Sequence, residues 1–181
     1  MRHVPSRLVS DDVVEAERTV AGNRHLVRVT FAVATLVVVV DQLTKYLAVR
    51  SLEGRPPVEL LGTWVRLVFL RNSGAAFSLG EGYTFVFTAI ALTVVLVIVR
   101  TSRKLGSLGW AIALGGLLGG ALGNLLDRIF REPGLLRGHV VDFIAFPHFA
   151  VFNVADASIV CSAVLMVLLA LRGIEIDGRR S

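Results

Sequence analysis

The sequence predicts an all-α membrane protein with four transmembrane helices and a small extracytoplasmic β-sheet. Its 181 residues are 54% hydrophobic and 18% charged, with a mean hydropathy of +0.70, and a soluble domain of this length is far less apolar. Four apolar runs long enough to cross a bilayer alternate with polar connections. One connection is rich in residues that favour strands, which predicts the sheet.

The first apolar run, residues 26–49, follows a polar segment of mixed charge. Residues 1–25 contain few large apolar side chains, a composition typical of a disordered tail. Basic residues before an apolar run also occur in secretory signals, but DQLTKYLAV (41–49) lacks a clear small-residue cleavage site. We therefore expect a retained first helix behind a disordered cytoplasmic tail.

The connection over residues 50–82 contains Gly and Pro and is expected to lie outside the membrane. Within it, TWVRLVFL (63–70) favours a strand, and RNSGAAFS (71–78) has the composition of a turn. This segment therefore predicts the extracytoplasmic sheet. The other spans are expected at residues 83–99, 106–126 and 152–171, and residues 172–181 are expected to form a second cytoplasmic tail.

Lys and Arg are concentrated before the first span, between the second and third spans, and after the fourth. This distribution predicts that both termini are cytoplasmic. The net charge of +5 then reflects topology and contact with lipid headgroups, because no basic stripe interleaved with aromatics indicates nucleic-acid binding. The same topology places four acids near the extracytoplasmic face: Asp41, Asp127, Asp142 and Asp156.

The third span is rich in glycine. Gly115, Gly119 and Gly123 are four residues apart and share one helical face, with Gly116 and Gly120 beside them. Small residues at this spacing allow a neighbouring membrane helix to approach closely. We interpret them as a packing surface, since a phosphate-binding loop would follow a strand in a soluble domain.

Asp142 and Asp156 each lie inside an apolar run, in the stretch GHVVDFIAFPHFAVFNVADA (138–157). A carboxylate in such surroundings loses hydration and needs a partner, a raised pKa, or both. Two carboxyl groups close together share a proton, so that one activates water while the other polarises a carbonyl. The pair therefore suggests aspartic protease chemistry.

Each acid also has a structural interpretation, which the residues alone leave open. Asn153 and Asp156 have the spacing of a helix cap with an acid in the first turn. Asp41 with Lys45, and Asp127 with Arg128, are possible ion pairs. Asp142 is the hardest to explain structurally, because no cation is near it in sequence. The helix dipole favours ionisation of Asp156, so Asp142 is expected to hold the proton at rest.

Other hydrolytic chemistries lack their sequence signals. Ser73 and Ser78 are on the same predicted side as His139 and His148, but no nucleophile elbow or Ser/Lys pattern surrounds them. No HExxH or similar ligand pair indicates zinc. Cys161 is the single cysteine and is interpreted as a small packing residue. No metal or other cofactor is therefore expected.

Five sequence blocks, taken in order, resemble the motif set of the lipoprotein signal peptidase (signal peptidase II) family. The resemblance covers about residues 26–171. A single block would be weak, but five ordered blocks between four spans are highly specific. The blocks are DQLTK (41–45), RNSGAAFS (71–78), GNLLDR (123–128), GHVVDF (138–143) and FNVAD (152–156).

The resemblance implies an intramembrane aspartic endopeptidase of the bacterial plasma membrane. Such enzymes remove the signal peptide from diacylglyceryl-modified prolipoproteins, cutting before the lipidated cysteine. It implies that Asp142 and Asp156 are the catalytic dyad and that Asp127 is a structural acid near the site. The residues implied in positioning or substrate contact are Asp41, Lys45, Asn72, Gly74, Asn124, Arg128 and Asn153.

The implied partners are lipid-modified prolipoproteins and membrane lipids, with no nucleic acid, and the chain is expected to be a monomer. The loop over residues 129–137 is longer than is common in the family, with a turn at Pro133 and Gly134. Two other classes remain as competing hypotheses: a proton- or cation-coupled transporter, and a noncatalytic membrane scaffold. A transporter would be expected to distribute its acids across the membrane and to contain an inverted repeat.

Overall fold

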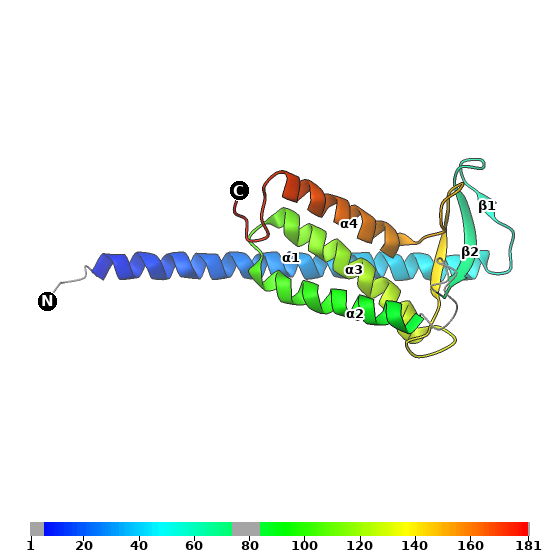
Figure 1. The fold of residues 1–181 in the computed structure, drawn as a ribbon, viewed down its shortest axis with the longest axis horizontal. Coiled ribbons are helices and arrows are strands. Elements are labelled where there is room, and N and C mark those ends of the chain that lie inside the picture. The colour runs from blue at the N-terminus through cyan, green and yellow to red at the C-terminus, as the bar shows by residue number, and fades with distance from the viewer. Residues whose placement is uncertain (1–5, 74–83, 181) are drawn as a thin grey trace.

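Four α-helices and a three-stranded sheet make up the computed structural model, which describes residues 6–73 and 84–180 (Figure 1). The sheet lies across one end of the helices, and the C-terminal segment lies at the other end. The helices are α1 (Ser6–Leu52), α2 (Thr84–Thr101), the short 3-10 helix η3 (Ser102–Lys104), α3 (Leu108–Phe130) and α4 (Val154–Leu171). The strands are β1 (Val58–Glu59), β2 (Arg66–Asn72) and β3 (Val140–Ala145).

Three helical segments are long and apolar enough to cross a membrane: Asn23–Leu52, Leu108–Phe130 and Val154–Leu171. Helix α2 is the remaining long helix, and its apolar segment, Thr88–Thr101, is shorter. A multi-pass helical membrane protein with a small sheet is thus confirmed. Apart from the start of α1, the helix boundaries lie within a few residues of the predicted spans.

Helix α1 begins at Ser6, about twenty residues earlier than predicted. Most of the segment that was expected to be a disordered tail is therefore helical, and Figure 1 shows it extending beyond the other helices. A polar composition does not exclude a helix here, because no Gly or Pro occurs between Pro5 and Gly22 to break it.

Helix α3 packs against the other three long helices, and its glycines make this possible. A Cβ atom on Gly115 or Gly119 would lie 2.7 Å from a backbone oxygen of α1, and one on Gly120 would lie 2.5 Å from the Ala155 oxygen of α4. Those distances are shorter than real Cβ contacts. The predicted packing surface is confirmed, with separate glycine faces for α1 and α4.

We expect Gly119→Ala to lower the free energy of unfolding by about 1–3 kcal/mol, because its Cβ would push against the backbone of Ala34. The matched control is Gly109→Ala in the same helix, whose Cβ would meet only the end of the Leu169 side chain. That change is expected to be close to neutral. Unfolding in mixed micelles measures both, and equal effects would contradict the packing role of Gly119.

The sheet is antiparallel in the order β1-β2-β3. Strand β2 largely overlaps the predicted strand, but β3 was not predicted: the sequence placed Asp142 in a loop, and the structure places it in a strand. Leu70 is opposite Asp142 and Asn72 is opposite Val140 in the register. Because Asn72 ends β2 close to Asp142, strand pairing brings the two predicted site residues together.

Candidate active site

Strand β3 carries Asp142 into the interior. Val140, Val141 and Asp142 are all buried, and the side chain of Asp142 is on the same strand face as Val140. The strand is fixed next to α3 because the Val141 N–H donates to Asp127 Oδ2 at 3.1 Å. A carboxylate of α3 therefore sets the position of the residue that precedes Asp142.

The chain turns after β3 and comes back alongside it. Phe152 pairs with Ile144, through a Phe152 N–H bond to the Ile144 oxygen at 3.0 Å and an Ile144 N–H bond to the Phe152 oxygen at 2.9 Å. The Phe152 ring stacks on Phe146, with ring centroids 5.7 Å apart. This return places the next residue, Asn153, beside Asp142.

Asn153 also begins helix α4. Its side chain accepts a hydrogen bond from the Asp156 N–H at 3.0 Å, and the Asp156 carboxylate accepts one from the Asn153 N–H at 3.2 Å. This is a capping box, as the sequence suggested. The cap holds the Asp156 carboxylate at the N-terminus of α4, where the helix dipole favours negative charge.

A single buried residue links the two aspartates. The Asn153 amide Nδ2 donates to Asp142 Oδ1 at 2.7 Å, while the Asn153 backbone N–H donates to Asp156 Oδ2. Asn153 has no exposed surface. Asp142 is also buried, but Asp156 is only partly buried. Asp142 and Asp156, which are fourteen residues apart in the sequence, thus share one hydrogen-bonding partner.

The Asp142 carboxyl group lies in an environment that favours its protonated form. Burial raises its pKa to about 6, and the nearby charge of Asp156 acts in the same direction. The hydrogen bonds from Asn153 and from Asn72 Nδ2, which is 2.8 Å from Asp142 Oδ2, oppose this shift. The pKa of Asp142 is thus shifted in the direction that makes this carboxyl group easier to protonate.

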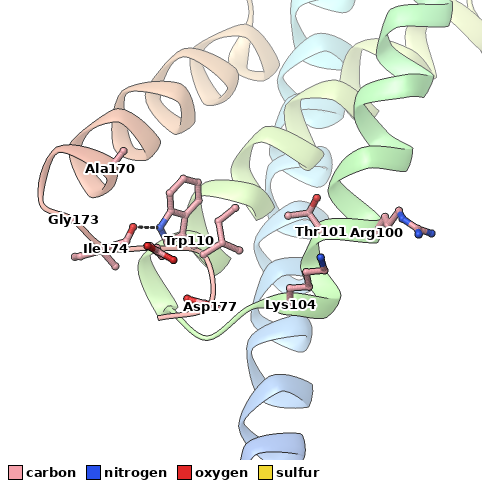
Figure 2. Close-up of a pocket in the computed structure, with 10 residues that line it drawn as sticks. Arg100, Thr101, Lys104, Trp110, Ala170, Gly173, Ile174 and Asp177 are labelled. Atoms are coloured by element: carbon pink, nitrogen blue, oxygen red, sulfur yellow. Dashed lines mark hydrogen bonds between the residues drawn. The ribbon is translucent and has the colours of Figure 1, made fainter. Parts of the chain in front are cut away.

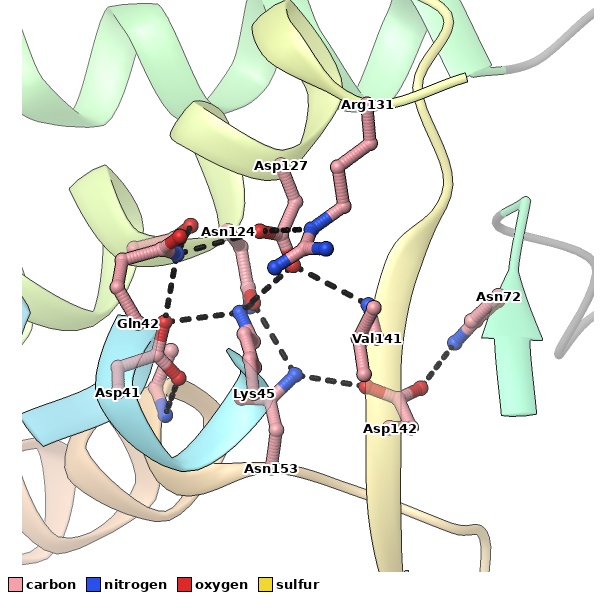
Figure 3. Close-up of polar contacts among 12 residues, drawn as sticks. Asp41, Gln42, Lys45, Asn72, Asn124, Asp127, Arg131, Val141, Asp142 and Asn153 are labelled. Carbon is pink, nitrogen blue, oxygen red and sulfur yellow. Dashed lines mark hydrogen bonds and ion pairs between the residues drawn. The ribbon is translucent and has the colours of Figure 1, made fainter. Parts of the chain in front are cut away.

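A buried lysine organises the helices behind the aspartates (Figure 3). Lys45 Nζ lies 2.9 Å from Asp41 Oδ2, 3.0 Å from Asp127 Oδ2 and 2.9 Å from Asn124 Oδ1. Neither Lys45 nor the two acids have exposed side-chain surface. We call these four residues, Asp41, Lys45, Asn124 and Asp127, the Lys45 cluster. It confirms the predicted Asp41–Lys45 ion pair.

Asn124 connects the Lys45 cluster to the aspartates. Its Nδ2 donates to Asp156 Oδ1 at 2.7 Å, and its Oδ1 accepts from Lys45 and from Asn153. Asp41 adds a second connection, because its Oδ1 accepts the N–H of Ala155 in the first turn of α4 at 2.9 Å. The cluster therefore holds the start of α4 from two sides.

Two residues of the site were missed by the sequence interpretation. Gln42 Nε2 donates to Asp41 Oδ2, to Asp127 Oδ1 and to the Gly123 oxygen. Arg131 Nε lies 2.7 Å from Asp127 Oδ1, one helical turn away. The i,i+4 spacing of Asp127 and Arg131 indicates this ion pair, whereas the sequence interpretation paired Asp127 with the adjacent Arg128.

The predicted site residues converge at one end of the helices. Arg128 interacts electrostatically with Asp127, Asp142 and Asp156. Gly74 lies outside the described residues. The remaining members, Asp41, Lys45, Asn72, Asn124, Asn153 and the two aspartates, form one connected set of hydrogen bonds and ion pairs. Such a site can place an extended peptide beside two carboxyl groups.

Comparisons with known proteins agree with this arrangement. A family model described as signal peptidase (SPase) II matches residues 33–172, which contain every member of the site. The chain is 53% identical to the lipoprotein signal peptidase of Streptomyces coelicolor over 174 residues, 96% of this chain and 84% of that protein. It is 48% identical to the lipoprotein signal peptidase of Mycolicibacterium smegmatis over 178 residues, 97% of this chain and 75% of that protein.

Solved structures give the same picture. A bacterial membrane enzyme structure obtained by the in meso method at 1.9 Å resolution matches with a TM-score of 0.70 and 30% identity, over 79% of this chain and 92% of that chain. A second such structure, at 2.3 Å, matches with a TM-score of 0.69 and 29% identity, over 78% and 87%.

Proposed function

Because the chain belongs to the signal peptidase II family, it is an aspartic protease that removes signal peptides from prolipoproteins, and we propose that Asp142 and Asp156 are its catalytic dyad. The observation that carries this assignment is Asn153, which donates to Asp142 through its side chain and to Asp156 through its backbone. One buried residue thus sets the position of both carboxyl groups.

The two aspartates take different roles in this proposal. Asp156, ionised at the helix N-terminus, accepts a proton from water as the water oxygen adds to the scissile carbonyl carbon. Asp142 is protonated and gives its proton to the carbonyl oxygen, forming a tetrahedral diol. When the diol collapses, Asp142 takes back a hydroxyl proton, Asp156 returns a proton to the leaving nitrogen, and the C–N bond breaks.

The pH dependence tests the role of Asp142. As the pH rises through about 6, the free enzyme loses the proton that Asp142 donates, so kcat/KM is expected to fall on the alkaline side. Asn72→Ala removes a hydrogen bond that stabilises the ionised carboxylate, which raises the pKa and moves this limb to higher pH. Rates of prolipoprotein cleavage from about pH 4.5 to about pH 9, in buffers of constant ionic strength, measure both. This range begins just above the usual carboxyl pKa and includes raised values.

The control for this profile is Arg71→Gln at the residue next to Asn72. Arg71 pairs with Glu53 on an exposed part of the sheet, so its loss should leave the alkaline limb in place. If the limb stays fixed in Asn72→Ala, or if kcat/KM rises through pH 6, Asp142 is not the proton donor.

The surrounding polar residues position the dyad in this proposal. Asn124 bonds to Asp156, and the Lys45 cluster fixes β3 and the first turn of α4. Arg128 contributes positive charge near both aspartates. Asn72 is at the end of β2, and with Gly74 it is assigned to hydrogen bonding with an extended substrate backbone, next to the cleaved bond.

The proposed position of the site in the membrane determines how the substrate reaches it. All four helices are assigned as spans of the bacterial plasma membrane, with both termini cytoplasmic and the sheet on the extracytoplasmic side. The substrate carries a diacylglyceryl group and is cut just before the lipidated cysteine. It enters laterally from the bilayer to a monomeric enzyme, with its acyl chains along the apolar helix faces. The acids gather at one end of the bundle, which is not the distribution expected of a transporter.

A further inference from the structure

A second cavity lies at the end of the bundle opposite the aspartates. It has a volume of about 660 Å³ and is formed by the ends of α2 and α4, the start of α3 and the C-terminal segment. Trp110 in its wall is fourteen residues before Asn124 on α3, which corresponds to about 21 Å along the helix. The cavity is therefore not part of the dyad site.

The C-terminal segment builds one wall of this cavity. The sequence placed residues 172–181 in a tail, but the segment folds back: the Trp110 indole N–H donates to the Ile174 oxygen at 2.7 Å, and the Gly106 N–H donates to the Ile176 oxygen at 2.9 Å. A Cβ on Gly178 would lie 2.5 Å from the Gly106 oxygen, so the contact is close. The segment is held firmly against the connection before α3.

The opposite wall is cationic. Figure 2 shows Trp110, Ile174 and Asp177 on one side and Thr101, Arg100 and Lys104 on the other. Within residues 6–73 and 84–180, no carboxylate forms an ion pair with Arg100 or Lys104.

A single arginine outside the cavity pairs with both of its acids. Asp177 and Glu175 line the same cavity, but Arg179 lies 2.7 Å from Asp177 and 3.7 Å from Glu175. Arg179 does not line the cavity. Arg179 compensates only one of the two acidic charges, so the three cations and two carboxylates together leave a net charge of +1, and Arg100 and Lys104 are the cations of the lining that no carboxylate of the described residues pairs with.

An apolar slot adjoins the cationic cavity. Its volume is about 350 Å³, and it lies between α2, α3 and α4. Thr101, Trp110 and Ile176 line both spaces, so the slot continues from the charged mouth into the helices. The rest of its lining is almost entirely apolar, including Val97, Ile98, Leu114, Leu117 and Met166.

We propose that this paired cavity binds an anionic glycerophospholipid, with its phosphate at Arg100 and Lys104 and one acyl chain in the slot between α2, α3 and α4. Basic pockets between membrane helices bind anionic lipid headgroups in this way. Trp110 lines both the charged cavity and the apolar slot, and an indole, which is apolar but has one hydrogen-bonding group, is favoured at such a boundary. A segment of signal peptide with a basic end would meet repulsion at the same mouth.

Tryptophan quenching tests this site in the full-length protein. The chain has two tryptophans, Trp64 and Trp110, and Trp64 is exposed beside the sheet at the other end. The variant Trp64→Phe therefore leaves Trp110 as a single reporter in the cavity wall. Reconstituted into phosphatidylcholine nanodiscs, it is titrated with phosphatidylglycerol that carries brominated acyl chains. We expect saturable quenching at low mole fraction, and weak, non-saturating quenching by brominated phosphatidylcholine.

The charge variants decide whether the two cations make the site. Arg100→Gln with Lys104→Gln is expected to raise the half-saturating mole fraction roughly 10- to 30-fold. The matched control is Arg24→Gln with Arg28→Gln, which removes two exposed cations from α1 near the same end without touching either cavity. That control should bind like the parent.

Three outcomes would overturn the proposal. One is quenching that does not depend on the headgroup, and another is an equal shift in both double variants, which would indicate general surface charge. The third is competition: inorganic phosphate or a signal peptide reduces the quenching of Trp110 by brominated phosphatidylglycerol as strongly as unbrominated phosphatidylglycerol does. That result would assign the cavity to free phosphate or to substrate. Prolipoprotein cleavage by each variant confirms that the chain is folded, and the readout does not depend on the assignment of the dyad.

Discussion

Asp142→Asn and Asp156→Asn are each expected to lower kcat/KM for prolipoprotein cleavage by about 10²- to 10⁴-fold, the usual contribution of a positioned acid or base. Asn keeps the shape of the side chain and one acceptor oxygen, so each variant retains one of the two hydrogen bonds that the aspartate accepts. The proton transfer is lost, however, because an amide does not titrate in this range. Cleavage of a lipid-modified prolipoprotein in mixed micelles measures the loss.

The matched control is Asp177→Asn, an exposed acid at the other end of the bundle that pairs with Arg179. It is expected to cleave at the parent rate. The free energy of unfolding of the dyad variants should fall by no more than about 1–3 kcal/mol, since the shape of the site is conserved and one accepted hydrogen bond is lost. Full activity in either dyad variant would exclude the assignment and would favour a structural role for the acids, such as the capping of α4 by Asp156.

The local elements of the site were predictable because their signals lie close together in the chain. The cap at Asn153 and Asp156 and the ion pair of Asp41 and Lys45 depend on spacings of three and four residues. The glycine faces of α3 follow from helical periodicity alone. Each of these interactions forms within one element or one turn, so the sequence pattern contains most of the information.

The contacts between distant elements were not predictable in detail. Lys45 and Asp127 meet only because α1 and α3 approach closely along their glycine face. Strand β3 was missed because its partner strand is about seventy residues away, and no local pattern specifies that pairing. The C-terminal segment was predicted to be a tail because it is polar. It is held by its backbone oxygens, which accept hydrogen bonds from Gly106 and Trp110 and which a sequence pattern does not reveal.

Lys45→Met is expected to lower the free energy of unfolding by about 3–5 kcal/mol, the usual cost of leaving a buried charge without its partner. Lys45 pairs with Asp41 and Asp127, and all three side chains are fully buried. Methionine is close to lysine in length and is apolar, so the change removes the charge with little loss of volume. Unfolding in mixed micelles, followed by circular dichroism, gives the free energy.

The second substitution decides whether charge is the cause. Asp127 keeps Arg131 when Lys45 is lost, whereas Asp41 keeps only the Gln42 side chain and the Ala155 N–H as hydrogen-bond donors. Adding Asp41→Asn to Lys45→Met is therefore expected to restore more stability than adding Asp127→Asn. Arg71→Met, which breaks the exposed pair with Glu53, should cost at most about 1 kcal/mol. If neither double variant recovers stability, the unpaired charges of Asp41 and Asp127 are not the cause of the loss, and the hydrogen bond from Lys45 to Asn124 is the contact that remains to explain it.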